Sequence, residues 1–171
     1  MKAKLIIEDK EIEIEISEEE YKKLHLSEEK ETGYERVSEE SDYFYANSRG
    51  YVETDSENCY SIDGDHYKSA NYYSDKIVAE NNARADKLMR QLRRFSVEHR
   101  GHGVDFNSTE TEKHYIYYDC VRDELRTTYT FYAGVFGVIY FDSEETANAA
   151  IDEFRDELIW YFTEYKDSLQ E

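Results

Sequence analysis

Residues 135–161 read VFGVIYFDSEETANAAIDEFRDELIWY, and this stretch decides the fold. Apolar and aromatic residues dominate Val135 to Phe141, which predicts a strand. Ser143 is a favoured N-cap residue and precedes two glutamates, so a helix is expected from there to about Leu169. Its apolar stripe recurs at helical spacing and consists of Ala147, Ile151, Phe154, Leu158, Tyr161 and Tyr165. Trp160 falls beside this stripe, and we expect it to be partly exposed.

The preceding segments repeat the same alternation of strands and a helix. Lys113 to Asp119 and Leu125 to Tyr132 are rich in aromatic and β-branched residues, which predicts two further strands. Ser74 is expected to cap a long helix that runs to about Glu98, and Gly101 and Gly103 are expected to end it. The apolar stripe of that helix consists of Val78, Ala85, Leu88, Leu92 and Phe95.

The first part of the main body predicts a hairpin and a loop. Tyr43 to Tyr45 is followed by a turn at Asn47–Gly50 and by a second strand through Glu53. Residues 55–66 are expected to form a loop, with a turn at Asp63–Asp65. These elements together predict an α+β fold, in which an antiparallel sheet is packed by two long helices.

The two halves also resemble each other in sequence. Tyr72-Tyr73-Ser74-Asp75 precedes the first long helix, and Tyr140-Phe141-Asp142-Ser143 precedes the last one, 68 residues later. We interpret this as a weak internal repeat of a strands-then-helix unit. The alternative is that aromatic strand, cap and helix recur through composition alone.

The N-terminus predicts a separate small unit. Lys4 to Glu8 is mostly apolar, Asp9-Lys10 is expected to turn, and Glu11 to Ile16 alternates strictly, as a half-buried strand does. Ser17-Glu18-Glu19-Glu20 is a capping box for a short helix. We therefore expect a β-hairpin-helix appendage at residues 1–26, an acidic linker at residues 27–42, and the main domain at residues 43–171.

Charge, the length of apolar runs and the number of cysteines exclude several classes of protein. The 171 residues include 40 acidic and 21 basic ones, a net charge of −19. Direct nucleic-acid binding is disfavoured, because it depends on lysines and arginines that neutralise phosphates. Neither a membrane span nor a secretory signal is expected, since no apolar run is long enough. Two cysteines do not form a disulfide framework, which favours a reducing cytosolic compartment.

Acidic residues gather in rows that could occupy a basic groove. Glu11, Glu13 and Glu15 recur every second residue of a predicted strand, at roughly 6.6–6.8 Å. The predicted helices continue this surface with Glu18, Glu19, Glu20, Asp152, Glu153, Asp156, Glu157 and Glu164. Such rows could imitate a nucleic-acid backbone. The alternative is that each row is an ordinary solvated face.

One stretch has the opposite charge. Residues 84–102 contain six basic and two acidic residues, a net charge of +4. Arg84, Lys87, Arg90 and Arg94 lie around one helix face and could contact a phosphate; Arg93 and Arg100 complete the set. The interpretation we favour is that these residues pair with the acidic surface of the same protein.

No motif predicts an enzyme. The sequence has no Walker A loop, G-x-S-x-G, G-x-G-x-x-G, CxxC or HExxH. We therefore predict a protein that is not an enzyme and that uses no metal or cofactor. Cys59 and Cys120 are expected to be small buried residues rather than nucleophiles.

Several of these segments resemble a set of small proteins from phages and prophages of Firmicutes. The resemblance rests on Tyr72-Tyr73-Ser74 and its helix, Leu92-Arg93-Arg94-Phe95, the strand Tyr115–Tyr118, and Val138–Ser143 with its two glutamates. The opening hairpin and helix are similar to a leader on several such proteins. Some small acidic members are anti-CRISPR proteins that block a Cas effector nuclease. The resemblance offers no catalytic motif, so it assigns no functional residue.

Together these features predict a phage-type inhibitor that binds a host protein with a basic nucleic-acid groove, with a type II CRISPR effector nuclease favoured. The mechanism would be acidic mimicry of nucleic acid or steric occlusion. The alternatives are a phage replication or host-takeover adaptor that binds a DNA-processing protein, and weak nucleic-acid binding through the helix of Arg84–Arg100. A homodimer is possible, because the N-terminal hairpin has an edge strand that could pair with a second copy.

Overall fold

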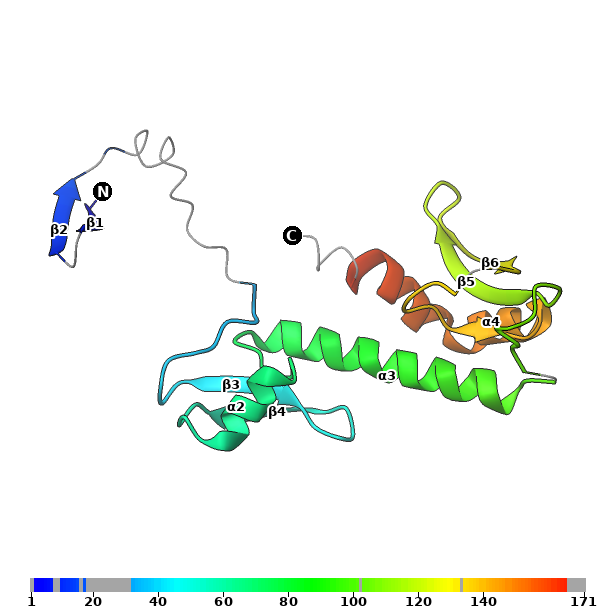
Figure 1. The fold of residues 1–171 in the computed structure, drawn as a ribbon, viewed down its shortest axis with the longest axis horizontal. Helices are drawn as coiled ribbons and strands as arrows, with labels where there is room; N and C mark the ends of the chain where they lie inside the picture. The colour runs from blue at the N-terminus through cyan, green and yellow to red at the C-terminus, as the bar shows by residue number, and fades with distance from the viewer. Residues whose placement is uncertain are drawn as a thin grey trace.

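The computed structural model describes residues 2–7, 10–15, 17, 32–101, 103–132 and 134–165. It has the expected α+β class, with helices and antiparallel sheets. The longest element is helix α3 (Lys76–Glu98). Strands β3 (Asp42–Ala46) and β4 (Val52–Ser56) and helix α2 (Ser61–Lys68) lie beside the first half of α3, as Figure 1 shows. Strands β5 (Lys113–Asp119) and β6 (Glu124–Thr130) and helix α4 (Glu144–Trp160) lie beside the second half of α3.

The two halves arrange their strands in the same order before their long helix. In the first half, β3 pairs with β4 on one side, and Phe44 forms a single bridge with Tyr73 on the other. In the second half, β5 lies between β6 and the two-residue strand β7 (Tyr140–Phe141). Tyr73 and Phe141 each stand just before a long helix, 68 residues apart. This correspondence favours the internal repeat, which stays a prediction.

Strand β7 is much shorter than the strand expected at Val135–Phe141. Gly137 has a φ of +77°, in the left-handed region that glycine adopts readily. The amide of Val135 donates to the Tyr140 hydroxyl at 2.6 Å, and the amide of Val138 donates to the Val135 carbonyl at 3.3 Å. These turn contacts use the backbone groups that a longer strand would need, so pairing with β5 begins only at Tyr140.

Helix α2 replaces the loop expected at residues 55–66. Its organising residue is Asp63, which is 1% exposed. The carboxylate of Asp63 accepts hydrogen bonds from the amides of Asn58 and Tyr60 at 3.1 and 2.9 Å. It also accepts one from the buried Tyr43 hydroxyl at 3.1 Å. The aspartate that suggests a turn in the sequence therefore closes the N-terminus of a helix, which carries Gly64 in its interior.

The long helix α3 begins one residue later than expected. Its N-cap is Asp75, whose carboxylate accepts from the amides of Ile77 and Val78 at 2.7 and 3.0 Å. The hydroxyl of Ser74 instead donates to Glu35 at 3.0 Å. Ser143 is the N-cap of α4, as expected, and accepts from the Thr146 amide at 3.1 Å.

Residues 32–41 fell within the expected linker, but they pack on the main domain. Arg36 donates twice to Glu57, from Nε at 2.8 Å and from the terminal guanidinium nitrogen at 3.0 Å. Gly33 has a φ of +82°, and a Cβ there would lie 2.7 Å from Val78. Each contact joins this segment to a distant part of the chain, so a linker at 27–42 does not extend over these residues.

The main core lies between α3, α4 and the second sheet, which consists of β5, β6 and β7. It consists of Leu88, Leu92, Phe95, Phe141, Ala147, Ala150, Ile151 and Leu158. Helix α4 ends at Trp160 and continues as the π-helical turn η1 (Tyr161–Tyr165); the expected continuation to Leu169 lies outside the described residues. Trp160 is only 7% exposed, contrary to the partial exposure that its position beside the stripe predicted.

The N-terminal hairpin consists of β1 (Lys2–Ile7) and β2 (Lys10–Glu15). Its register places Ile7 opposite Lys10. Lys10 therefore belongs to a strand, which corrects the expected turn at Asp9-Lys10. The helix expected after Ser17 lies outside the described residues, and the appendage at 1–26 stays a prediction. None of the described helices combines the length and the apolar composition needed to cross a membrane.

Candidate binding surfaces

A groove between α3 and α4 brings the predicted basic and acidic residues face to face. Its volume is about 540 Å³. Arg84 and Lys87 line it from α3, and residues 152–157 line it from α4. Arg84 donates to both oxygens of Glu157, at 2.8 and 3.2 Å. Arg84 was a possible phosphate contact and Glu157 a possible partner-binding residue. Their pairing agrees with the favoured interpretation, in which the basic stretch pairs with acids of the same protein.

Arg84 also covers the only tryptophan of the chain. Its guanidinium carbon lies 3.8 Å from the centroid of the Trp160 ring. A guanidinium stacked on an aromatic face gains cation–π attraction in addition to its ion pair. Arg84 therefore fastens α3 to the end of α4, which favours the interpretation that it pairs within the protein.

Replacing Arg84 with alanine removes the ion pair with Glu157 and the stacking on Trp160, and is expected to lower the free energy of unfolding by about 1 kcal/mol. The loss is no larger because both side chains of the pair are 42% exposed, so solvent screens their attraction. The variant should also shift the fluorescence emission of Trp160 to longer wavelength, since the ring becomes more exposed. Thermal unfolding and emission spectra test both effects. The matched control is Arg94→Ala, and an unchanged spectrum in Arg84→Ala would contradict the stacking.

Of the other predicted phosphate contacts, Arg90 and Arg94 do not line the groove that holds Arg84. Lys87 lines the same groove. Arg90 lies near the β3–β4 turn, where a Cβ on Gly50 would come within 3.0 Å of its guanidinium. Arg94 pairs with Glu98 at 3.7 Å, one helical turn away.

The predicted acids of α4 divide into two groups. Glu157 is held by Arg84, and Asp152 accepts from Arg155 at 2.9 Å. Glu153 and Asp156 are exposed and make no ion pair with any described residue. Together with Glu144 and Glu145 near the start of the helix, Asp152, Glu153 and Asp156 form what we call the α4 acidic band; all five are exposed.

The first part of this band borders an acidic hollow that the sequence did not predict. The hollow has a volume of about 490 Å³, and its carboxylates come from Glu110, Glu112, Asp142, Glu144 and Glu145. His114, which is 7% exposed, lies 3.0 Å from Glu112. The hollow joins a loop before β5 to the start of α4, so no local sequence pattern reveals it.

Two of the three predicted acids of the N-terminal hairpin are paired in register with lysines. In the register of β1 and β2, Glu13 faces Lys4 and Glu15 faces Lys2, while Glu11 faces Ile6. Directly opposed residues share one face of a strand pair. The expected row of carboxylates on this strand stays a prediction. Glu18, Glu19 and Glu20 lie outside the described residues.

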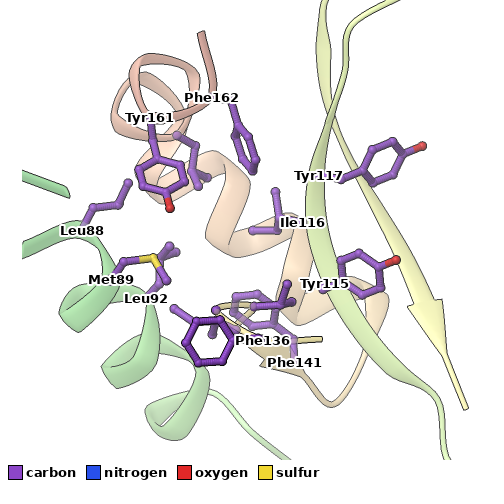
Figure 2. A pocket seen from close by; sticks show the side chains of 14 residues that line it. Leu88, Met89, Leu92, Tyr115, Ile116, Tyr117, Phe136, Phe141, Tyr161 and Phe162 are labelled. Atoms are coloured by element: carbon purple, nitrogen blue, oxygen red, sulfur yellow. The ribbon is translucent and has the colours of Figure 1, made fainter. Parts of the chain in front are cut away.

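An apolar cavity of about 320 Å³ lies between α3, β5 and the end of α4. Figure 2 shows Leu88, Met89 and Leu92 on the α3 side and Tyr161 and Phe162 on the α4 side. Ile116 points from β5 toward the helices, whereas Tyr115 and Tyr117 lie on the other side of the strand. Burial raises the pKa of Tyr161. Most of its lining residues are aliphatic or aromatic.

Titratable groups that could suggest chemistry have structural partners. Glu57, which is 1% exposed, accepts from Arg36, from the Cys59 amide at 2.9 Å and from the Tyr72 hydroxyl at 2.9 Å. Burial and the hydrogen bond to Glu57 raise the pKa of Tyr72 to about 12. Within the described residues, no three His, Cys, Asp or Glu side chains are grouped to hold a metal ion. Cys59 and Cys120 are both exposed, which corrects the expectation that they are buried.

Comparison with protein families, with curated proteins and with solved structures finds no match for this chain. The candidate surfaces must therefore be judged by their own chemistry. The similarity to phage proteins stays a prediction from the sequence.

Proposed function

We propose that this protein is a phage-type inhibitor that binds a host nucleic-acid-handling protein by presenting carboxylates to its basic groove. A type II CRISPR effector nuclease is the favoured partner. The observation that carries the proposal is the α4 acidic band. Glu145 and Asp152 are seven residues apart, which places them on one side of the helix. The backbone of Phe154 departs from helical geometry, but Asp152, Glu153 and Asp156 on its two sides still line one groove.

The charge of the band is available to a partner. Only Asp152 among its five members forms an ion pair with a described residue, and Arg155 in that pair is itself half exposed. A basic groove that met this face would replace hydration by charge-assisted hydrogen bonds to carboxylates. Long-range attraction from a net charge of −19 would also accelerate the encounter at low salt.

Binding by acidic occupancy fits these surfaces better than direct binding of nucleic acid. Arg84, the first of the predicted phosphate contacts, is already engaged by Glu157 and Trp160. Lys87 lines a groove whose opposite wall carries Asp152, Glu153, Asp156 and Glu157. Phosphates approaching this groove would meet carboxylates, which repel them.

The experiment is electrophoretic competition with a guide-loaded type II effector nuclease and a labelled target DNA. The wild-type protein should prevent the effector–DNA complex at low salt, and less effectively as salt rises. A variant with Glu145→Lys, Asp152→Lys and Asp156→Lys should need about 100-fold more protein for the same inhibition, since like charges across an interface cost several kcal/mol.

The matched control reverses three exposed acids outside the band: Glu39→Lys, Glu80→Lys and Glu98→Lys. It changes the net charge by the same amount, so equal losses in both variants would show that only overall charge matters. If the wild-type protein leaves the effector complexes intact at saturating concentration, inhibition of this effector is wrong.

A further inference from the structure

A second groove lies along the C-terminal part of α3. Its volume is about 590 Å³. Met89, Arg93, Val97 and Arg100 line it along the helix and just beyond, Val104 and Phe106 line it from the next loop, and residues 137–140 close it. We call it the Arg93–Arg100 groove.

The groove exposes apolar side chains that the core does not use. Val97 is 57% exposed and Phe106 is 58% exposed. The neighbouring loop adds Val135 at 49% and Phe136, which is fully exposed. Exposed apolar residues gathered in one place mark interaction surfaces, whereas isolated ones need no explanation.

The walls of the groove are held in place before any partner arrives. Lys113 is 1% exposed, and its Nζ donates to the carbonyls of Ser108 and Phe131, both at 2.8 Å. It thereby joins the loop before β5 to the loop after β6. The Phe106 ring packs edge-on against Tyr140, with centroids 5.4 Å apart, and the hydroxyl of Ser96 donates to the Tyr140 carbonyl at 2.7 Å.

The cations of the groove have no carboxylate partner among the described residues. Arg93 and Arg100 are both exposed and form no ion pair there, in a chain with 40 acidic residues. Aromatic residues, methionine and arginine are enriched at protein interfaces, and Met89, Phe106 and the two arginines line this groove. A phosphate backbone would satisfy the arginines but would leave Val97 and Phe106 exposed to water.

We propose that the Arg93–Arg100 groove binds an acidic peptide segment of a partner protein, with one or two large apolar side chains seated between the arginines. Carboxylates of the segment would pair with Arg93 and Arg100, and its apolar residues would cover Val97 and Phe106. This surface is distinct from the α4 acidic band, so it is independent of the proposed inhibition.

The test uses the full chain and a fluorescein-labelled 14-residue peptide of Glu and Asp with Leu and Phe at helical spacing. Fluorescence polarisation should give a dissociation constant on the order of 10 μM, as expected for a small interface. Arg93→Glu should weaken binding at least tenfold, and Val97→Ser several-fold. Arg94→Glu, one residue along but outside the groove, is the matched control and should change binding less than threefold.

Each opposite result overturns the proposal. These results are absence of binding by the full chain at 1 mM peptide, equal losses in Arg93→Glu and Arg94→Glu, and equal binding of a peptide with Lys in place of Glu and Asp. Tighter binding of a DNA oligonucleotide that displaces the peptide would assign the groove to nucleic acid. A dimer by light scattering that Arg93→Glu dissociates would assign it to a second copy. Thermal unfolding of every variant confirms that it is folded.

Discussion

Replacing Phe141 with alanine is expected to lower the free energy of unfolding by about 3–5 kcal/mol. Phe141 is 1% exposed and belongs to the core formed by α3, α4 and the second sheet. Its backbone pairs with His114 of β5, so its ring is fixed where strand and helices meet. Removing the ring forfeits its apolar burial and leaves a cavity that these elements cannot fill without moving.

Urea unfolding followed by circular dichroism measures this loss. The matched control is Phe136→Ala, five residues earlier in the same segment, where the ring is fully exposed and the expected change is within about 0.5 kcal/mol. A loss of this size is a large share of the total stability of a domain, about 5–15 kcal/mol, so Phe141→Ala should unfold at a clearly lower urea concentration than wild type. Equal stability of the two variants would contradict this account of the core.

The elements that the sequence predicts well are those whose pattern is local. The strand Lys113–Asp119 has its expected bounds, and the stripe of α3 follows helical spacing, with Ala85, Leu88, Leu92 and Phe95 buried. Ser143 caps α4 through its own hydroxyl, which accepts from the amide of Thr146, three residues later. Each of these features depends on neighbours that the chain itself places nearby.

The elements that the sequence misses depend on partners far along the chain. Helix α2 needs Asp63 to bond Tyr43, 20 residues away. The polar segment at 32–41 packs because Arg36 finds Glu57, 21 residues away, and Trp160 is buried partly because Arg84 covers it. Periodicity carries no information about such pairs, so the polar residues of these two segments predict a loop and a linker.

The same limit applies to the candidate surfaces. Composition alone predicted an acidic protein with a basic stretch, but Arg84 and Glu157 are 73 residues apart and their pairing follows only from the packing of α3 on α4. Arg93 and Arg94 are adjacent in sequence. Only the fold separates them, because Arg93 faces a groove built from two later loops and Arg94 pairs with Glu98.

Replacing Glu57 with glutamine is expected to lower the melting temperature at pH 7 by roughly 5–10 °C. Its carboxylate holds together the segment at 32–41, the loop before α2, and Tyr72. The hydrogen bonds from Arg36 lower the pKa of Glu57 from 4.5 to about 2, against the effect of burial. Glutamine keeps the shape of the side chain but loses the charge that attracts Arg36.

The pH dependence distinguishes the charge from the shape. Because the pKa of Glu57 is lower in the folded state, its ionised form stabilises the fold above about pH 4.5, and this contribution is lost as the pH falls toward 2. Other carboxylates also become protonated in this range, which relieves the self-repulsion of a chain with a net charge of −19.

The informative quantity is therefore the difference in melting temperature between wild type and Glu57→Gln, which should shrink from pH 7 to pH 3. Glu39→Gln, at an exposed position, should match wild type at both values. A difference that stays constant with pH would mean that the charge of Glu57 does not stabilise the fold, and that the segment at 32–41 is held by packing alone.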